Sequence, residues 1–324
     1  PTPVVADSRV LGRRLTGIPT PGMAASSTQV REGQRPARRL APGSATGVGR
    51  ATVSEVCRPR HDAPIVRSIV HSWRRATAVT PIEHQDEGMD LAREIAPDVF
   101  CVGPHGRSQT NVYFVRSSDS WVLVDAGWQS DLSRIEQAAA DLIGPDTAPA
   151  AIVLTHDHPD HSGAARALAQ RWACRVFVHP AELAFARGSF AAMWRHAGPL
   201  DRYVILPAIS AIGRRRRDAT LERNSLASVI DVLGPDGHVP DLPGWRWVHT
   251  PGHTPGHVSF FRADDGVLIS GDAVLTLQVN SLAGMLRGRP GLSGPPWYTT
   301  ADLSLIHISE PTRPPLLSRM PSSA

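Results

Sequence analysis

The chain has 324 residues, of which 41% are hydrophobic and 20% charged, a composition typical of a globular protein with a substantial buried core. It has no apolar run near the ~18 residues of a membrane span, and its three cysteines are too few for a disulfide framework. These features exclude a membrane-spanning or disulfide-stapled protein. Because we find no signal-peptide pattern, we expect a cytoplasmic protein with no membrane partner.

The net charge of +4 is distributed unevenly along the chain. All 34 basic residues are arginines, and residues 1–88 carry a net charge of +6, whereas residues 89–303 carry −3. The basic character therefore lies outside the expected folded domain. We expect a small-molecule substrate and no nucleic-acid partner, and the oligomeric state stays open.

The N-terminal 88 residues show no sustained hydrophobic period of 3.6 or 2. They are rich in Pro, Gly, Ala, Ser and Arg, a composition typical of unstructured chain. Met89 opens the first stretch with the pattern of a folded protein. We therefore expect residues 1–88 to be a disordered or spurious extension, and residues 89–303 to form the domain.

Apolar patterns in the domain predict strands and helices in alternation. Two β-rich runs around a serine-rich turn predict a hairpin, and Ser130 precedes an amphipathic helix that ends at Gly144. The predicted strands are 111–115, 121–125, 151–154, 175–178, 245–248, 257–261 and 267–270, with a further helix at 163–172. Residues 187–240 lack a clear pattern. This order predicts an α/β or α+β fold with a mixed sheet.

The C-terminal segment differs from the domain. A helix is expected to begin at Thr300–Asp302, but Pro311 and the prolines after it would end it. The stretch from Ser304 to Arg313 resembles translated sequencing-adapter read-through. We therefore expect residues 304–324 to be a non-native tail and the domain to be truncated at its C-terminus.

The strongest chemical signal is the run from Thr155 to Gly163, which holds three histidines and two aspartates. It directly follows a buried strand and precedes a helix. Imidazole and carboxylate are the usual ligands of zinc and similar divalent ions. His156 and His158 can chelate one ion from this loop, and Asp160 and His161 can reach a second.

Two later segments each place one ligand-type side chain at the end of a strand. His253 lies in a Gly/Pro turn, and Asp272 ends the apolar run that begins at Val267. Such positions collect functional residues, because loops at strand ends gather at one edge of a sheet. Together with the histidine cluster, they predict a metal site.

The ordered set of motifs resembles the metallo-β-lactamase superfamily, and within it the glyoxalase II-like hydrolases. The resemblance covers roughly residues 98–303 and rests on Leu-Val-Asp-Ala-Gly at Asp125, His-x-His-x-Asp-His at 156–161, Thr-Pro-Gly-His at His253 and Ser-Gly-Asp at Asp272. It implies an αββα sandwich, two mixed sheets flanked by helices, with two divalent metal ions at one edge.

The resemblance also implies a role for each residue. His156, His158 and His253 would bind the first metal, Asp160 and His161 the second, and Asp272 both. Asp125 would orient a ligand histidine from behind, and we expect His257 to support the site without binding metal. The superfamily's final histidine ligand has no clear counterpart, because His307 lies in the suspect tail and outside a Gly-His turn.

The expected activity is metal-dependent hydrolysis, in which a metal-bound hydroxide cleaves an ester-like bond of a small molecule, namely a thioester, lactone or amide. Asp160 is the expected catalytic carboxylate, and zinc is the expected metal, with iron or manganese as alternatives. Three alternatives stay open: a mononuclear iron oxidoreductase of the persulfide dioxygenase type, a nucleic-acid hydrolase of the same superfamily, and an inactive truncated fragment.

Overall fold

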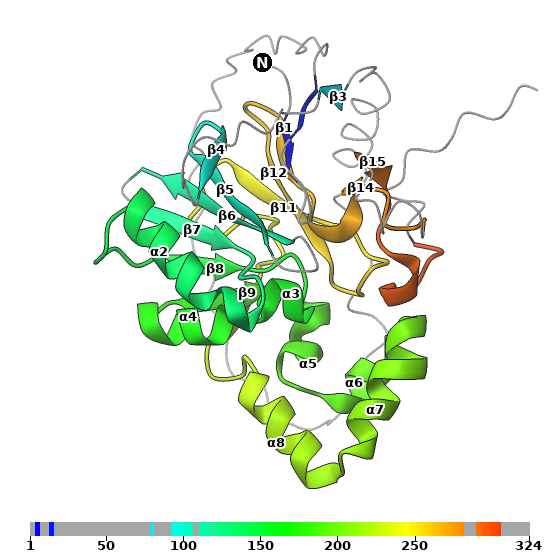
Figure 1. Ribbon diagram of the computed structural model, residues 1–324. Helices are drawn as coiled ribbons and strands as arrows, with labels where there is room; N and C mark the ends of the chain where they lie inside the picture. The colour runs from blue at the N-terminus through cyan, green and yellow to red at the C-terminus, as the bar shows by residue number, and fades with distance from the viewer. Residues whose placement is uncertain are drawn as a thin grey trace, which may run out of the picture.

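Two β-sheets packed face to face form the centre of the molecule (Figure 1). This computed structural model describes residues 92–105, 110–118, 120–281 and 290–305, together with the backbone of three short strands in the N-terminal extension. Those strands are β1 (Val4–Ala6), β2 (Arg13–Leu15) and β3 (Val79–Thr80). The rest of the extension and His307 lie outside the described residues, so the expectations for them stay predictions.

The larger sheet is mixed and has the strand order β10-β9-β8-β7-β6-β5-β4. Strands β4 to β7 pair antiparallel, whereas β7, β8, β9 and β10 run parallel. Its strands are β4 (Arg93–Ala96), β5 (Val99–His105), β6 (Thr110–Ser117), β7 (Ser120–Val124), β8 (Ala151–Val153), β9 (Arg175–Val178) and β10 (Ile230–Val232). The parallel part brings the carboxyl ends of β7 and β8 to one edge.

The smaller sheet is built on β11 (Trp245–His249), β12 (Val258–Arg262) and β13 (Val267–Ile269), which pair antiparallel in this order. β1 extends it by pairing parallel with β13, and β2 and β3 follow. A separate two-stranded sheet joins β14 (Leu275–Leu277) to β15 (Pro290–Ser293).

Side chains along the central strands point alternately to the two faces of the larger sheet, and this divides the core into two layers. Phe114, Leu123 and Ile152 face the helices α2 (Leu132–Leu142) and α4 (Ala165–Trp172). Val122 and Val153, which point the opposite way, pack against the smaller sheet. The sequence predicts these elements because both faces of the strands are buried. The prediction of an α/β fold with mixed sheets is confirmed.

A group of helices between β9 and β10 forms a lobe at one end of the molecule (Figure 1). It comprises η2 (Pro180–Glu182), α5 (Leu183–Ala186), α6 (Phe190–Arg195), η3 (Asp201–Ile205), α7 (Leu206–Ala211) and α8 (Arg214–Asn224). The sequence pattern missed this lobe because its longest helix has no apolar stripe. All eleven residues of α8 are described, and none of them is buried.

The prediction of a helix that begins at Thr300–Asp302 is wrong for the part of this segment that the structure describes. The one-turn helix η5 (Trp297–Thr299) ends just before this point, and Thr300 is extended. Backbone bonds from Ala301 N to His253 O and from Asp302 N to Gly252 O instead hold this segment against another loop. None of the helices formed by the described residues combines the length and apolar character that crossing a membrane requires.

Ile152 tests the two-layer core because it is fully buried in the central strand β8. Replacing it with alanine leaves a cavity in close-packed surroundings, so Ile152→Ala is expected to lower the free energy of unfolding by about 2–5 kcal/mol. Urea denaturation measures the change. Val204→Ala, at a mostly exposed position, is the control and should change stability by less than about 0.5 kcal/mol.

Candidate metal centre

The segment that follows β8 carries four of the expected ligands. Leu154 N still bonds to Phe177 O of β9, and the chain then turns through His156 and His158 into the one-turn helix α3 (Pro159–Ser162). Pro159 occupies the first position of this helix, where its missing N–H costs no hydrogen bond. Asp160 and His161 are thereby turned inward and buried.

Two further loops of the smaller sheet complete the centre. Thr250 N bonds to His257 O and closes the loop that holds His253. Asp272 lies in the short helix η4 (Gly271–Ala273) directly after β13. Gly271 is required here because its φ is 55° and a Cβ would lie 2.7 Å from His257 Nε2.

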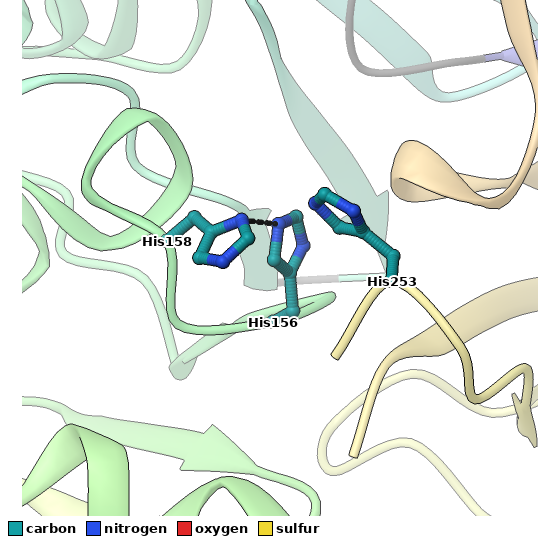
Figure 2. Close-up of side chains that lie close together, drawn as sticks. All are labelled: His156, His158 and His253. Carbon is teal, nitrogen blue, oxygen red and sulfur yellow. Dashed lines mark hydrogen bonds between the residues drawn. The ribbon is translucent and has the colours of Figure 1, made fainter. Parts of the chain in front are cut away.

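The side chains form two groups that share His156. In the first, the rings of His156, His158 and His253 converge from two different loops (Figure 2), with His156 Nε2 3.2 Å from His158 Nδ1. The second group consists of His156, His161 and Asp272, all fully buried. Each group offers three ligand atoms that lie within 4.8 Å of one another.

Asp272, a member of the second group, also faces the first. Its Oδ1 is 3.4 Å from His161 Nε2, and its Oδ2 is 3.3 Å from His253 Nε2. Asp160 is near the second group, since its Oδ2 is 3.8 Å from His161 Nε2 and accepts a hydrogen bond from Thr110 Oγ1. Each carboxylate oxygen of Asp272 thus faces a different histidine.

Partners behind the histidines fix which ring nitrogen carries the proton. Thr300 Oγ1 donates to Pro296 O at 2.7 Å, so it accepts from His253 Nδ1–H at 3.3 Å. His161 Nδ1–H donates to Asp125 Oδ2 at 2.8 Å. These bonds leave the Nε2 lone pairs of both histidines directed at the centre, as metal ligation requires.

Asp125 organises the second group from behind. Its carboxylate accepts from Thr155 N at 2.8 Å and from Thr155 Oγ1 at 2.9 Å. Thr155 Oγ1 therefore accepts from His156 Nδ1–H, 3.1 Å away, which leaves the Nε2 of His156 for the centre. Asp125 has a φ of 59°, a left-handed conformation that aspartate tolerates better than most residues.

His257 supports Asp272 and does not belong to either group. Its Nε2 accepts from the backbone N–H of Asp272 at 3.0 Å, and its Nδ1–H donates to Thr250 Oγ1 at 2.8 Å. Burial lowers the pKa of His257 to about 3, so the ring is neutral, as these bonds require. His257 thus holds the backbone that carries the Asp272 carboxylate.

The electrostatics of the centre favour a bound cation. Burial and the neighbouring histidines, His161 foremost, lower the pKa of His156. Burial opposes the charged form of His161 as well, but the carboxylates of Asp125 and Asp160 outweigh it and raise the pKa of His161. A metal ion would supply the positive charge that these carboxylates attract.

The spacing of the ligand atoms fits metal ions of the size of zinc. Zinc bound to nitrogen at about 2.0–2.1 Å places neighbouring ligands of a tetrahedron roughly 3.3 Å apart. The His156–His158, His253–Asp272 and His161–Asp272 pairs lie 3.2, 3.3 and 3.4 Å apart. His161 Nε2 is also a buried atom without a hydrogen-bond partner, which an ion would satisfy.

Comparison with known proteins supports this geometry. Residues 105–305, more than half of the chain, match the family model described as the metallo-beta-lactamase superfamily. The chain belongs to this superfamily. It is also 35% identical over 205 residues to the probable metallo-hydrolase YflN of Bacillus subtilis, a match that covers 62% of this chain and 75% of YflN. The prediction of a probable metallo-hydrolase is confirmed.

Two further relatives are less similar to the chain. The probable metallo-hydrolase YybB of Bacillus subtilis is 28% identical over 170 residues, which cover 52% of this chain and 64% of YybB. A crystal structure of TTHA1623 in a di-iron-bound form is 26% identical, with a TM-score of 0.40, and the match covers 65% of this chain and 83% of that one. The chain thus spans less than two thirds of YybB.

Sequence analysis missed several residues that hold the ligands. Thr155 directly precedes His156, and a hydroxyl at that position could have pointed to it, whereas Thr110 lies 50 residues from its partner Asp160. Thr300 and Glu182 carry no such signal. They come from segments 47 and 74 residues away from their partners His253 and Gly256, and only the fold brings them together.

Proposed function

We propose that the chain hydrolyses an ester-like bond of a small molecule, namely a thioester, lactone or amide, with two divalent metal ions, zinc first among them. The observation that carries the proposal is the position of Asp272, whose two oxygens face histidines of both groups. A carboxylate so placed can hold two ions side by side. Bound there, such ions lower the pKa of water toward neutrality and polarise a carbonyl oxygen.

The protein's own residues have distinct parts in this reaction. His156, His158 and His253 would hold one ion, and His161, Asp160 and Asp272 the other, with Asp272 shared. Asp160 lies beside the second group and is oriented by the hydroxyl of Thr110. This placement supports Asp160 as the group that accepts the proton of the attacking water and passes it toward the leaving group.

Burial indicates the side from which substrate approaches. His156, His161 and Asp272 are fully buried, whereas His158 is half-buried. Gly198, just before η3, packs closely against Thr300, whose Oγ1 bonds to His253, so the helical lobe lies near the first group. Residues of the lobe are therefore the natural contacts for the part of the substrate that does not react, in keeping with a glyoxalase II-like arrangement.

A panel of thioesters, lactones and amides tests the bond type. Purified protein should hydrolyse at least one of these classes, and His158→Ala should abolish turnover by removing a ligand of the first group. His238→Ala, at an exposed histidine outside both groups, is the matched control and should leave turnover unchanged. Oxygen consumption with bound iron, in place of hydrolysis, would contradict the proposal.

A further inference from the structure

Glu182 is a buried carboxylate between the two histidine loops. It ends η2, the turn that follows β9, and only 1% of its surface is exposed. Its Oε2 accepts a hydrogen bond from Asp157 N at 3.2 Å, and its Oε1 accepts one from Gly256 N at 2.6 Å. Each oxygen therefore holds a different loop.

These two loops carry all three histidines of the first group. Asp157 lies between His156 and His158, and Gly256 follows His253 by three residues. Hydrogen bonds to an ionised carboxylate are shorter and stronger than neutral ones, particularly where the carboxylate is shielded from water. A displacement of either loop would leave the Glu182 carboxylate without one of its donors.

A second contact joins the same turn to the same loop. The ring of His179 stacks on that of His249, with centroids 4.3 Å apart and planes 12° from parallel. His249 Nε2–H in turn donates to Pro255 O at 2.9 Å, next to Gly256. Burial lowers the pKa of His179 to about 4, so the neutral ring can accept from Ala181 N through Nδ1.

Gly256 shows how closely the loop approaches Glu182. A Cβ at position 256 would lie 2.8 Å from both Glu182 N and Glu182 Cγ. The φ of Gly256 is not in the left-handed region, so alanine would be strained by Glu182 and not by its own backbone. The glycine therefore permits the short bond between Gly256 N and Glu182.

We propose that Glu182 is a positioning residue that sets the spacing of the first metal site by holding the loops of His156–His158 and His253 together. It touches neither the metal nor the substrate and acts through the two backbone N–H groups. The proposal rests on the proposed function, because it assumes that these three histidines bind a metal ion.

Two substitutions break this contact from opposite sides. Glu182→Gln keeps the shape but replaces one acceptor oxygen by an NH₂ group, and Gly256→Ala pushes the loop away while Glu182 stays in place. Glu222→Gln, on the exposed face of α8, is the matched control. Each full-length variant is stripped of metal and titrated with Co²⁺, with the dissociation constant and the visible spectrum as readouts.

Both variants should raise the dissociation constant of the first Co²⁺ site about 10–100-fold, the range expected for residues that orient ligands. Both should also change the visible spectrum of the bound Co²⁺ in the same way. The double variant should bind Co²⁺ no more weakly than the single variant with the lower affinity, because the two substitutions remove the same contact. Glu222→Gln should match the unsubstituted protein.

Unchanged affinity and spectrum in the folded variants would overturn the proposal, and so would strictly additive effects in the double variant. If Glu182→Gln fails to fold, as shown by circular dichroism, Gly256→Ala decides alone. Failure of the unsubstituted protein to bind Co²⁺ is a different result, because it contradicts the proposed function and not the role of Glu182 within it.

Discussion

An Asp272→Ala variant is expected to lose bound metal and hydrolytic turnover together. Asp272 faces His161 and His253 at 3.4 and 3.3 Å, so its removal affects both groups at once. The several kcal/mol of transition-state stabilisation that such ions supply correspond, at about 1.4 kcal/mol per tenfold change, to a loss of roughly 10³-fold or more. Elemental analysis and initial rates on the responsive substrate measure the two effects.

The Asp272→Ala experiment has a clear control and a clear contradiction. Asp264→Ala removes an exposed carboxylate from a turn between two strands of the same sheet and should change neither metal content nor rate. The backbone N–H of Asp272 still reaches His257 in the variant, so a folded protein is expected. Full metal content with full turnover in Asp272→Ala would refute the shared position of this carboxylate.

Asp125→Ala is expected to cause the largest loss of stability among the site variants. It removes a buried acceptor from Thr155 N, Thr155 Oγ1 and His161 Nδ1, which leaves these donors unsatisfied. Breaking a buried charged pair in this way costs about 3–5 kcal/mol. Alanine is also disfavoured at the left-handed φ of 59°. Urea denaturation of the metal-free protein measures the loss.

Asp125→Asn separates the backbone effect from the loss of charge. Asparagine tolerates the left-handed conformation, so this variant should be more stable than Asp125→Ala. It should still bind metal about 10–100-fold more weakly, because an amide orients His161 less strongly than a carboxylate does. Asp146→Ala, at an exposed turn, is the control. Equal stability of Asp125→Ala and the unsubstituted protein would contradict the role of Asp125.

The core strands could be predicted from the sequence, but the helical lobe could not. Residues 151–154 and 176–178 are apolar because both faces of the sheet are covered there, and β8 and β9 contain them. α8 gives no such signal, because none of its residues is buried and its packing, such as that of Arg217 on the ring of Phe190, does not depend on an apolar stripe. Local patterns identify an element only when burial is what determines its sequence.

The same limit applies to the site. The spacing of His156, His158 and His161 identifies a metal loop, because these ligands come from one short segment at the end of a strand. Thr300 and Glu182 act on His253 and Gly256 through contacts between distant segments. The hydrophobic pattern of the sequence contains no trace of such contacts, so Thr300 and Glu182 could be identified only from the structure.

Whether the chain is a metal-dependent hydrolase is tested most directly by reconstitution of the chelator-stripped protein with measured equivalents of Zn²⁺. Hydrolysis of the responsive ester-like substrate is followed at each step. We expect no turnover without metal, and a rise that saturates at two equivalents, when His156, His158 and His253 hold one ion and Asp160, His161 and Asp272 hold the other. Full turnover by the metal-free protein would contradict this function.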